Sequence, residues 1–161
     1  MMCCLVLGSF ASRPSYVGRI KEGDKMTSQD LRVKVAGETL FSKAICRDSF
    51  YVTVDRYSVL KLAKEFKHYI EIEKGIIYKR GGFDCEDYAQ GLASWVSQAY
   101  AMRGYRTPAV GEFHFMYKDK EQGHAVVIGC DKDGMFFVEP QTAQLVKLSY
   151  DEKRGCILAK F

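Results

Sequence analysis

The stretch that most constrains the fold is Gly81–Ala89, which reads Gly-Gly-Phe-Asp-Cys-Glu-Asp-Tyr-Ala. Downstream of it, apolar residues recur at the spacing of one helix face, and Gly104 supplies a stop. Asp84 is a good N-cap, and Asp87 can return a hydrogen bond from three residues further on, as in a capping box. The pattern predicts a helix that begins at Cys85, directly after a sharp turn at the two glycines.

The position of Cys85 makes it a candidate nucleophile. First-turn N–H groups and the positive end of the helix dipole both favour a thiolate. Glu86 and Asp87 disfavour an anion there, so a well-activated thiolate needs a further cation, either an imidazolium or a bound metal. The alternative interpretation is a small buried cysteine on an apolar helix face, which is what most free cysteines are.

Length and composition indicate one globular domain. The 161 residues are 47% hydrophobic and 13% aromatic, which is ample for a single core. We expect residues 1–30 to be a loosely ordered lead-in and residues 31–161 to form the domain. The formal net charge is +4 and no basic block occurs, so binding to nucleic acid is not indicated.

The cysteines and the first residues indicate the cellular compartment in which the protein works. The six cysteines include no CxxC pair, which disfavours zinc and a disulfide framework and suits a reducing environment. Met1–Phe10 is apolar but too short to span a bilayer, and no Lys or Arg precedes it. The sequence therefore predicts no membrane span and a cytoplasmic location, in a cellular or phage-encoded protein. A truncated secretory signal ending near Ala11 is the alternative.

The remaining periodicity predicts an α+β fold. Leu31–Val35 alternates apolar and charged residues as a half-buried strand does, and Phe50–Val54 is a second candidate strand. Ser58 can cap a helix whose apolar face continues to Ile70. After Gly104 the pattern changes to strands, expected at Ala109–Tyr117, His124–Cys130, Met135–Glu139, Leu145–Leu148 and Ile157–Phe161. We expect an antiparallel sheet packed against the helices.

Two polar segments follow the cysteine helix. They are Gly123–Ile128, which contains His124, and Phe136–Thr142, which contains Glu139 and Gln141. If the intervening turn pairs Cys130 with Met135, the two strands are in register. Gln141 then lies opposite His124, and Glu139 is a diagonal neighbour at roughly 7–8 Å. A slip of one residue would separate them unless a bulge restored the register.

Together these residues supply a set of groups for nucleophilic acyl transfer. The chemistry needs a thiolate, an imidazole that shuttles its proton and an acid that orients the imidazole. Cys85, His124 and Glu139 provide them in that order, with Gln141 as the alternative orienting residue. Structural alternatives stand beside these roles, since His124 suits a satisfied core histidine and Glu139 a surface acid. His114, in an alternating strand, is the rival base.

Three segments carry a family resemblance: Phe83–Ala89, Gly123–Val127 and Val138–Thr142. They resemble the transglutaminase-like cysteine protease superfamily, and more closely its bacterial transglutaminase-like cysteine proteinases and small phage-type relatives. The resemblance covers roughly Tyr78 to Thr142. It implies a papain/transglutaminase-like fold, with the catalytic cysteine helix packed on an antiparallel β-sheet, and catalytic roles for Cys85, His124 and Glu139.

This chain departs from the family pattern in its third residue. The superfamily typically has Asp there, sometimes Asn, whereas this sequence offers Glu139 with Gln141 nearby. Calcium-dependent, exported members use carboxylates beside the cysteine, and the resemblance therefore implies a calcium site at Asp84 and Glu86. The capping roles of Asp84 and Asp87 explain part of the same pattern without a metal.

The resemblance implies a thiol hydrolase with a Cys-His-Glu triad, acting through a thioester acyl-enzyme on a peptide, isopeptide or related amide bond. A peptide or protein substrate is the implied partner, acyl transfer to an amine is a related activity, and no cofactor apart from calcium is implied. The alternative is a catalytically silent transglutaminase-like interaction or structural module of viral origin. The reactivity of Cys85 toward iodoacetamide distinguishes the two.

Overall fold

The computed structural model describes residues 14–117 and 122–161. The helices in these ranges are η1 (Tyr16–Arg19, a 3-10 helix), α1 (Ser28–Thr39), α2 (Arg56–His68), η2 (Tyr69–Glu73, a π-helix), α3 (Cys85–Met102) and α4 (Tyr150–Arg154). The strands are β1 (Lys25–Thr27), β2 (Phe50–Val52), β3 (Val110–Met116), β4 (Gly123–Asp131), β5 (Gly134–Glu139), β6 (Gln144–Val146) and β7 (Cys156–Lys160). None of the described helices is long and apolar enough to cross a membrane.

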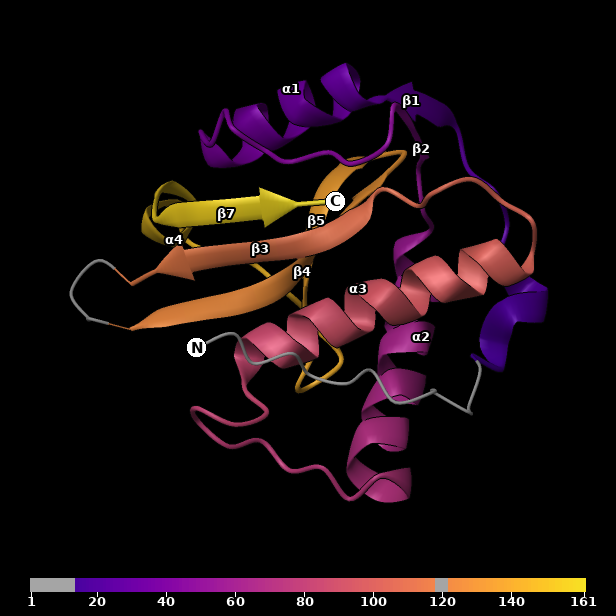
Figure 1. Cartoon of the computed structure of the whole chain (residues 1–161). Helices are drawn as coiled ribbons and strands as arrows, with labels where there is room; N and C mark the ends of the chain where they lie inside the picture. Colours follow the sequence, from indigo (N-terminus) through magenta and orange to yellow (C-terminus); the bar gives the residue numbers. More distant parts are fainter. Residues whose placement is uncertain (1–13, 118–121) are drawn as a thin grey trace.

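Five strands form one antiparallel sheet in the order β6-β5-β4-β3-β7, and β1 pairs with β2 in a separate two-stranded sheet (Figure 1). Cys130 lies opposite Met135 and Asp131 opposite Gly134, so the predicted register of β4 and β5 is confirmed. On the other side of β4, His124 lies opposite Phe115 of β3. This register brings the end of β4 that carries His124 close to the end of β5.

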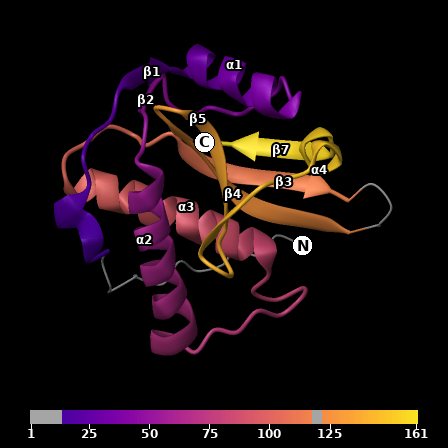
Figure 2. The ribbon, with the colours of Figure 1, turned by 180° about the vertical axis from the view of Figure 1, so that it is seen from behind.

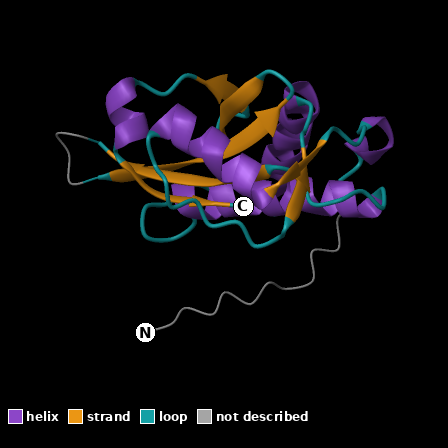
Figure 3. Ribbon diagram, turned by 90° about the horizontal axis from the view of Figure 1, so that it is seen from above, coloured by secondary structure: helices purple, strands orange, loops and turns teal. Residues whose placement is uncertain are grey.

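Alternate residues of the sheet face two separate hydrophobic cores. Ala125 and Val127 pack with α2 and α3 in one core, whereas Phe113, Val126 and Ile128 pack with α1 in the other. This alternation follows from the period of two along a strand. Helices accordingly lie on both sides of the strands, as the view from above shows (Figure 3).

Aromatic packing fixes α3 against α2. The Phe66 ring meets Tyr88 edge-on with centroids 6.4 Å apart and lies tilted against Trp95 at 5.9 Å. A Cβ at Gly91 would lie 2.5 Å from the Phe66 ring, so glycine permits this close approach. The two helices cross at a steep angle in both the front and the rear view (Figure 2).

The predicted strand Leu31–Val35 is wrong, because these residues lie in α1. The Thr27 hydroxyl accepts a hydrogen bond from the Asp30 N–H at 3.1 Å, and the Asp30 carboxylate accepts from the Thr27 N–H at 3.0 Å. This capping box starts a helix just before the segment. The two end residues of the segment are fully buried one turn apart, while Val33 is 61% exposed.

Replacing Thr27 by alanine should lower the free energy of unfolding by about 1 kcal/mol, because the N-cap acceptor of α1 is lost. Thr27→Ser keeps a hydroxyl at the same position and should stay near the wild-type value. Urea melts of the three proteins measure the difference. Equal stabilities of Thr27→Ala and wild type would show that the capping box does not hold this helix start.

Most other predicted elements are confirmed. The strands expected within residues 109–117, 124–130 and 135–139 are β3, β4 and β5. The helix expected from Ser58 begins at Arg56, because the Asp55 carboxylate accepts from the Ser58 N–H at 2.8 Å and acts as the cap. The division into a lead-in of residues 1–30 and one domain stays a prediction.

The predicted papain/transglutaminase-like arrangement is corrected. It placed the cysteine helix on one antiparallel sheet. The cysteine helix α3 does pack on the five-stranded sheet, but the described residues also form a second, two-stranded sheet and a twelve-residue α1 on the face opposite α3. The segment predicted as a strand, Leu31–Val35, belongs to that additional helix, because a capping box outweighs a short alternating pattern.

Candidate functional site

The start of α3 is built as the sequence predicts. Asp84 is the N-cap, and its carboxylate accepts from the Glu86 N–H at 3.2 Å. The Asp87 carboxylate accepts from the Asp84 N–H at 3.1 Å and completes the capping box. Cys85 is therefore held in the first turn, half-buried against the core formed by α2, α3 and the sheet.

The surroundings of Cys85 raise the pKa of its thiol. Burial is the largest cause, and the negative charges of Asp84 and Glu86 raise the pKa further. The N–H groups of Ala125 and of Cys85 itself oppose these effects but do not outweigh them. Burial and the flanking carboxylates together therefore keep the Cys85 side chain a thiol near neutral pH.

We expect Cys85 to react slowly with iodoacetamide near neutral pH, because the thiolate is the attacking species and a raised pKa keeps it scarce. The rate should rise by roughly tenfold per pH unit below the pKa. Peptide mapping of timed reactions measures it, with Cys46, whose thiol pKa burial also raises, as an internal control. Faster modification of Cys85 in the folded than in the unfolded chain would contradict the expectation.

His124 and Glu139 form a close pair at the ends of β4 and β5. The His124 Nε2 lies 2.6 Å from a Glu139 carboxylate oxygen, and both side chains are mostly buried. Phe115 meets the imidazole edge-on with ring centroids 5.7 Å apart, and Tyr117 lies parallel to it at 6.4 Å. The Gln141 backbone N–H donates to the other Glu139 oxygen at 3.2 Å. Glu139 is thus the residue that orients the ring.

Cys85 lies near this pair. Its sulfur interacts with the N–H of Ala125, the residue that follows His124. The pKa of Tyr117 is raised by burial first and then by the charges of Glu152, Glu139 and Cys85, which places Cys85 and Glu139 around one tyrosine. Among the described residues no hydrogen bond joins the Cys85 sulfur to the His124 ring, and the direct contact stays a prediction.

His114, the rival base, lies on the α3 side of the sheet. Its Nε2 is 3.2 Å from a Glu112 oxygen, and its Nδ1 is 3.8 Å from Glu86. Lys160 also contacts Glu112, at 3.0 Å. Burial by itself raises the pKa of Glu112, but the bonds from His114 and Lys160 outweigh it and leave the pKa below its usual value.

The implied calcium site at Asp84 and Glu86 has no support in the described part of the chain. No group of three or more His, Cys, Asp or Glu side chains there could hold a metal ion. The two Asp84 oxygens accept hydrogen bonds from the Glu86 and Gly81 N–H groups. Asp84 thus serves as a helix cap.

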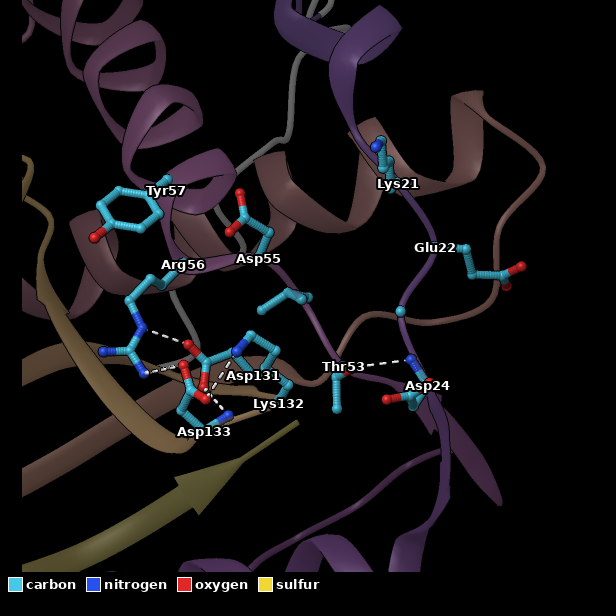
Figure 4. A pocket seen from close by; sticks show the side chains of 12 residues that line it. Lys21, Glu22, Asp24, Thr53, Asp55, Arg56, Tyr57, Asp131, Lys132 and Asp133 are labelled. Carbon is cyan, nitrogen blue, oxygen red and sulfur yellow. Dashed lines mark hydrogen bonds and ion pairs between the residues drawn. The ribbon is translucent and has the colours of Figure 1, made fainter.

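A separate pocket of about 270 Å³ lies away from Cys85 (Figure 4). Three chain segments form it: the approach to β1, the start of α2 and the turn between β4 and β5. The lining residues are Lys21, Glu22, Gly23, Asp24, Thr53, Val54, Asp55, Arg56, Tyr57, Asp131, Lys132 and Asp133.

One wall of the pocket is fixed by an ion pair. The Arg56 Nε donates to the buried Asp131 carboxylate, and a second Arg56 nitrogen lies 4.0 Å from Asp133. The other Asp131 oxygen accepts from the N–H groups of Asp133 at 2.8 Å and Gly134 at 3.0 Å. Burial raises the pKa of Asp131, but Arg56 and these N–H groups outweigh it and hold the pKa below its usual value.

The sequence analysis missed this pocket. It assigned residues 131–134 to a hairpin turn and Lys21–Asp24 to the lead-in, and neither assignment suggests binding. The available signal was the charge density of two short segments, Asp55–Tyr57 and Asp131–Asp133. Sequence alone does not show that these segments meet.

Comparisons with known proteins show similarity in fold to solved structures. No protein-family model and no curated protein matches this sequence. A solved structure described as "PSL1a-E64 complex" matches with a TM-score of 0.66 at 14% identity, over 85% of this chain and 51% of that chain. Polyporus squamosus lectin bound to the "human-type influenza-binding epitope Neu5Aca2-6Galb1-4GlcNAc" matches with a TM-score of 0.67 at 13% identity, over 85% of this chain and 49% of that chain. This chain thus spans about half the length of each.

These likenesses, which include a lectin, contradict the papain/transglutaminase-like fold. The predictions built on that fold are corrected with it, namely the cysteine protease or other thiol hydrolase, the acyl transferase and the peptide or protein substrate. The physical reason lies at Cys85, where the pKa is raised and the thiolate that the chemistry requires is not preformed. The family resemblance itself and the cytoplasmic location stay predictions.

Proposed function

We propose that this chain is a carbohydrate-binding domain and that a saccharide occupies the pocket beside the start of α2. The observation that carries the proposal is the lining, which combines charged donors and acceptors with the exposed ring of Tyr57 (Figure 4). A sugar presents hydroxyl groups, which both donate and accept, around an apolar ring of C–H groups.

The volume of the pocket limits the part of a saccharide that enters. At about 270 Å³ it lies just below the roughly 300–1,000 Å³ typical of small-molecule sites. A single sugar ring suits this size. We therefore expect one terminal residue of a glycan to enter while the rest of the chain extends into solvent.

Tyr57 offers the apolar surface. Its side chain is 70% exposed, although it lies in the first turn of α2 beside the pocket. Single exposed aromatic residues are common on protein surfaces, so exposure alone indicates nothing. Here Tyr57 is one of the residues that line a recess with polar groups. A contact between two aromatic rings contributes about 0.5–1.5 kcal/mol, which sets the scale for stacking on Tyr57.

The polar walls are held in place before any ligand arrives. Arg56 and two backbone N–H groups fix Asp131 on one side. On the other side the Thr53 hydroxyl accepts from the Asp24 N–H at 2.8 Å, and the Thr53 N–H donates to the Asp24 carbonyl at 2.8 Å. Preorganised groups lose less entropy when a ligand binds, which favours affinity.

The comparison with Polyporus squamosus lectin supports the class of ligand. That protein is described in complex with a sialylated trisaccharide. This chain spans about half of it at 13% identity, so the likeness shows a shared fold and does not transfer a binding site. The proposal takes from it only carbohydrate as the kind of ligand.

Calorimetric titration with glucose, galactose, N-acetylglucosamine and the trisaccharide named for the lectin tests the proposal. We expect at least one of these saccharides to bind. Tyr57→Ala should weaken that binding by about fivefold, because the stacking surface is lost, while Tyr57→Phe should retain it. Absence of saturable binding to the whole panel, or equal binding by wild type and Tyr57→Ala, would overturn the proposal.

A second candidate is the binding of E64 beside Cys85 and the His124–Glu139 pair. The observation that favours it is the complex of PSL1a with E64, in a protein that shares the fold. Binding of E64 to this chain, followed by mass spectrometry and thermal shift, tests it. We expect Cys85→Ser to abolish the complex and Cys156→Ser to leave it intact. Failure of wild type to bind E64 would eliminate this candidate.

A further inference from the structure

We infer that the saccharide carries a free amino group, an inference that rests on the proposed function and concerns the same pocket. The lining contains five carboxylates and three cations. The carboxylates belong to Glu22, Asp24, Asp55, Asp131 and Asp133, and the cations to Lys21, Arg56 and Lys132. The pairing of these charges decides which of them face a ligand.

Three of the carboxylates already have cationic partners. Asp131 is paired with Arg56, and Asp133 lies 3.1 Å from the Lys132 ammonium. Glu22 accepts from the Arg106 N–H at 3.0 Å and lies 3.8 Å from its guanidinium. An incoming ligand would have to compete with these partners.

Asp24 and Asp55 have no cationic partner among the described residues. One Asp55 oxygen accepts from the N–H and the hydroxyl of Ser58, both at 2.8 Å, and the second oxygen is left for a ligand. The Asp24 carboxylate makes no hydrogen bond or ion pair within the described part of the chain, where the Asp24 backbone bonds to Thr53. Of the lining cations only Lys21 is left to offset these two charges.

The positive end of the α2 dipole partly offsets this excess of negative charge in the pocket. A helix N-terminus is equivalent to roughly half a positive charge, and the capping carboxylate of Asp55 already faces it. Asp24 lies outside the helix and does not cap it. Figure 4 shows Asp24 beside Thr53, on the side of the pocket opposite the Arg56, Asp131 and Asp133 group. An ammonium group on the sugar fits the Asp24 side.

The same charges disfavour an acidic sugar. A carboxylate in the pocket would meet two unpaired carboxylates against one free lysine, and like charges repel. The preferred ligand therefore differs in charge from the sialylated trisaccharide in the lectin complex. N-acetylation of the amine should also weaken binding, because it removes the positive charge.

Three sugars with the same ring test the inference: glucosamine, N-acetylglucosamine and glucuronic acid. At slightly acidic pH, where the amine is protonated and the carboxylates are ionised, we expect affinity to fall in that order. Each step should be about fivefold at low salt, the upper range for one partly exposed ion pair, and should shrink as salt is added.

Two variants test whether Asp24 causes the preference for the amino sugar. Asp24→Asn should reduce the preference for glucosamine over N-acetylglucosamine to near one. Glu22→Gln, at a carboxylate that is already paired, should leave the preference intact. If none of these three sugars binds while glucose, galactose or the trisaccharide does, the inference fails and the proposed function stands; if no saccharide of either panel binds, the proposed function fails too. If N-acetylglucosamine or glucuronic acid binds as tightly as glucosamine, or if Asp24→Asn keeps the preference, the inference fails while carbohydrate binding stands.

Discussion

Arg56→Ala should lower the free energy of unfolding by about 3 kcal/mol, because it leaves the Asp131 carboxylate buried without its cation. The Asp131 side chain is only 6% exposed, whereas Arg56 retains 30% exposure. The latter value places the effect at the low end of the range for breaking a buried pair. The Arg56 guanidinium also lies over the Phe136 ring at 5.7 Å, and that contact is lost too.

Asp131→Asn provides the matched comparison. The asparagine oxygen can still accept from the Asp133 and Gly134 N–H groups, but the negative charge is removed. In the double variant no charge is left buried and unpaired, so its stability should exceed that of Arg56→Ala. Urea melts of the four proteins give the coupling. Additive losses would mean that Arg56 and Asp131 do not act as a pair.

The pH dependence of the stability of the same proteins provides a second test. The pKa of Asp131 is lowered in the folded state, so its contribution to stability is fully present above its ordinary pKa of about 4. It is lost as the pH falls through the folded-state value. Wild type should therefore lose more stability in acid than Asp131→Asn does. An equal loss of stability of both proteins at low pH would contradict the role of this carboxylate.

Gly111→Ala should destabilise the protein about as much as Arg56→Ala does, for a steric reason. A Cβ at Gly111 would lie 2.1 Å from the Lys160 carbonyl oxygen and 3.0 Å from the Phe161 Cα, and both are backbone atoms. The clash can be relieved only if β7 moves away from β3. We expect a loss of about 3 kcal/mol or more in the free energy of unfolding.

Gly37→Ala is the matched control for that substitution. Gly37 is exposed in α1 and has no atom within 4 Å of the position that a Cβ would take. Alanine favours a helix over glycine, so this variant should gain about 0.5–1 kcal/mol. Chemical denaturation of both variants tests the opposite signs. Similar effects of the two substitutions would show that the close approach of β3 and β7 is not the cause.

Local signals in the sequence predicted the parts of the fold that local interactions determine. The capping box of Asp84 and Asp87 placed the start of α3 at Cys85, because both partners lie within four residues. The short turn at residues 131–134 set the register of β4 and β5 and brought Glu139 to His124. Each of these features depends on neighbours in the chain or on one hairpin.

Features that depend on distant contacts escaped prediction. The pocket joins residues 21–24, 53–57 and 131–133, and no short-range pattern links them. The pKa of Cys85 was also beyond reach, because burial, its largest cause, depends on tertiary packing. The resemblance of three short segments then suggested an activity that the likenesses to solved structures contradict, and a shared arrangement of residues does not by itself define a function.

An NMR titration of the labelled protein with glucosamine, followed at the backbone amides, tests most directly whether the pocket is a saccharide site. We predict saturable shifts of the amides of Thr53–Tyr57 and Asp131–Asp133, which line the pocket, with the Cys85 and His124 amides unchanged. The absence of saturable shifts with glucosamine would contradict an amino sugar as the ligand, and shifts confined to Cys85, His124 and Glu139 would contradict carbohydrate binding at this pocket.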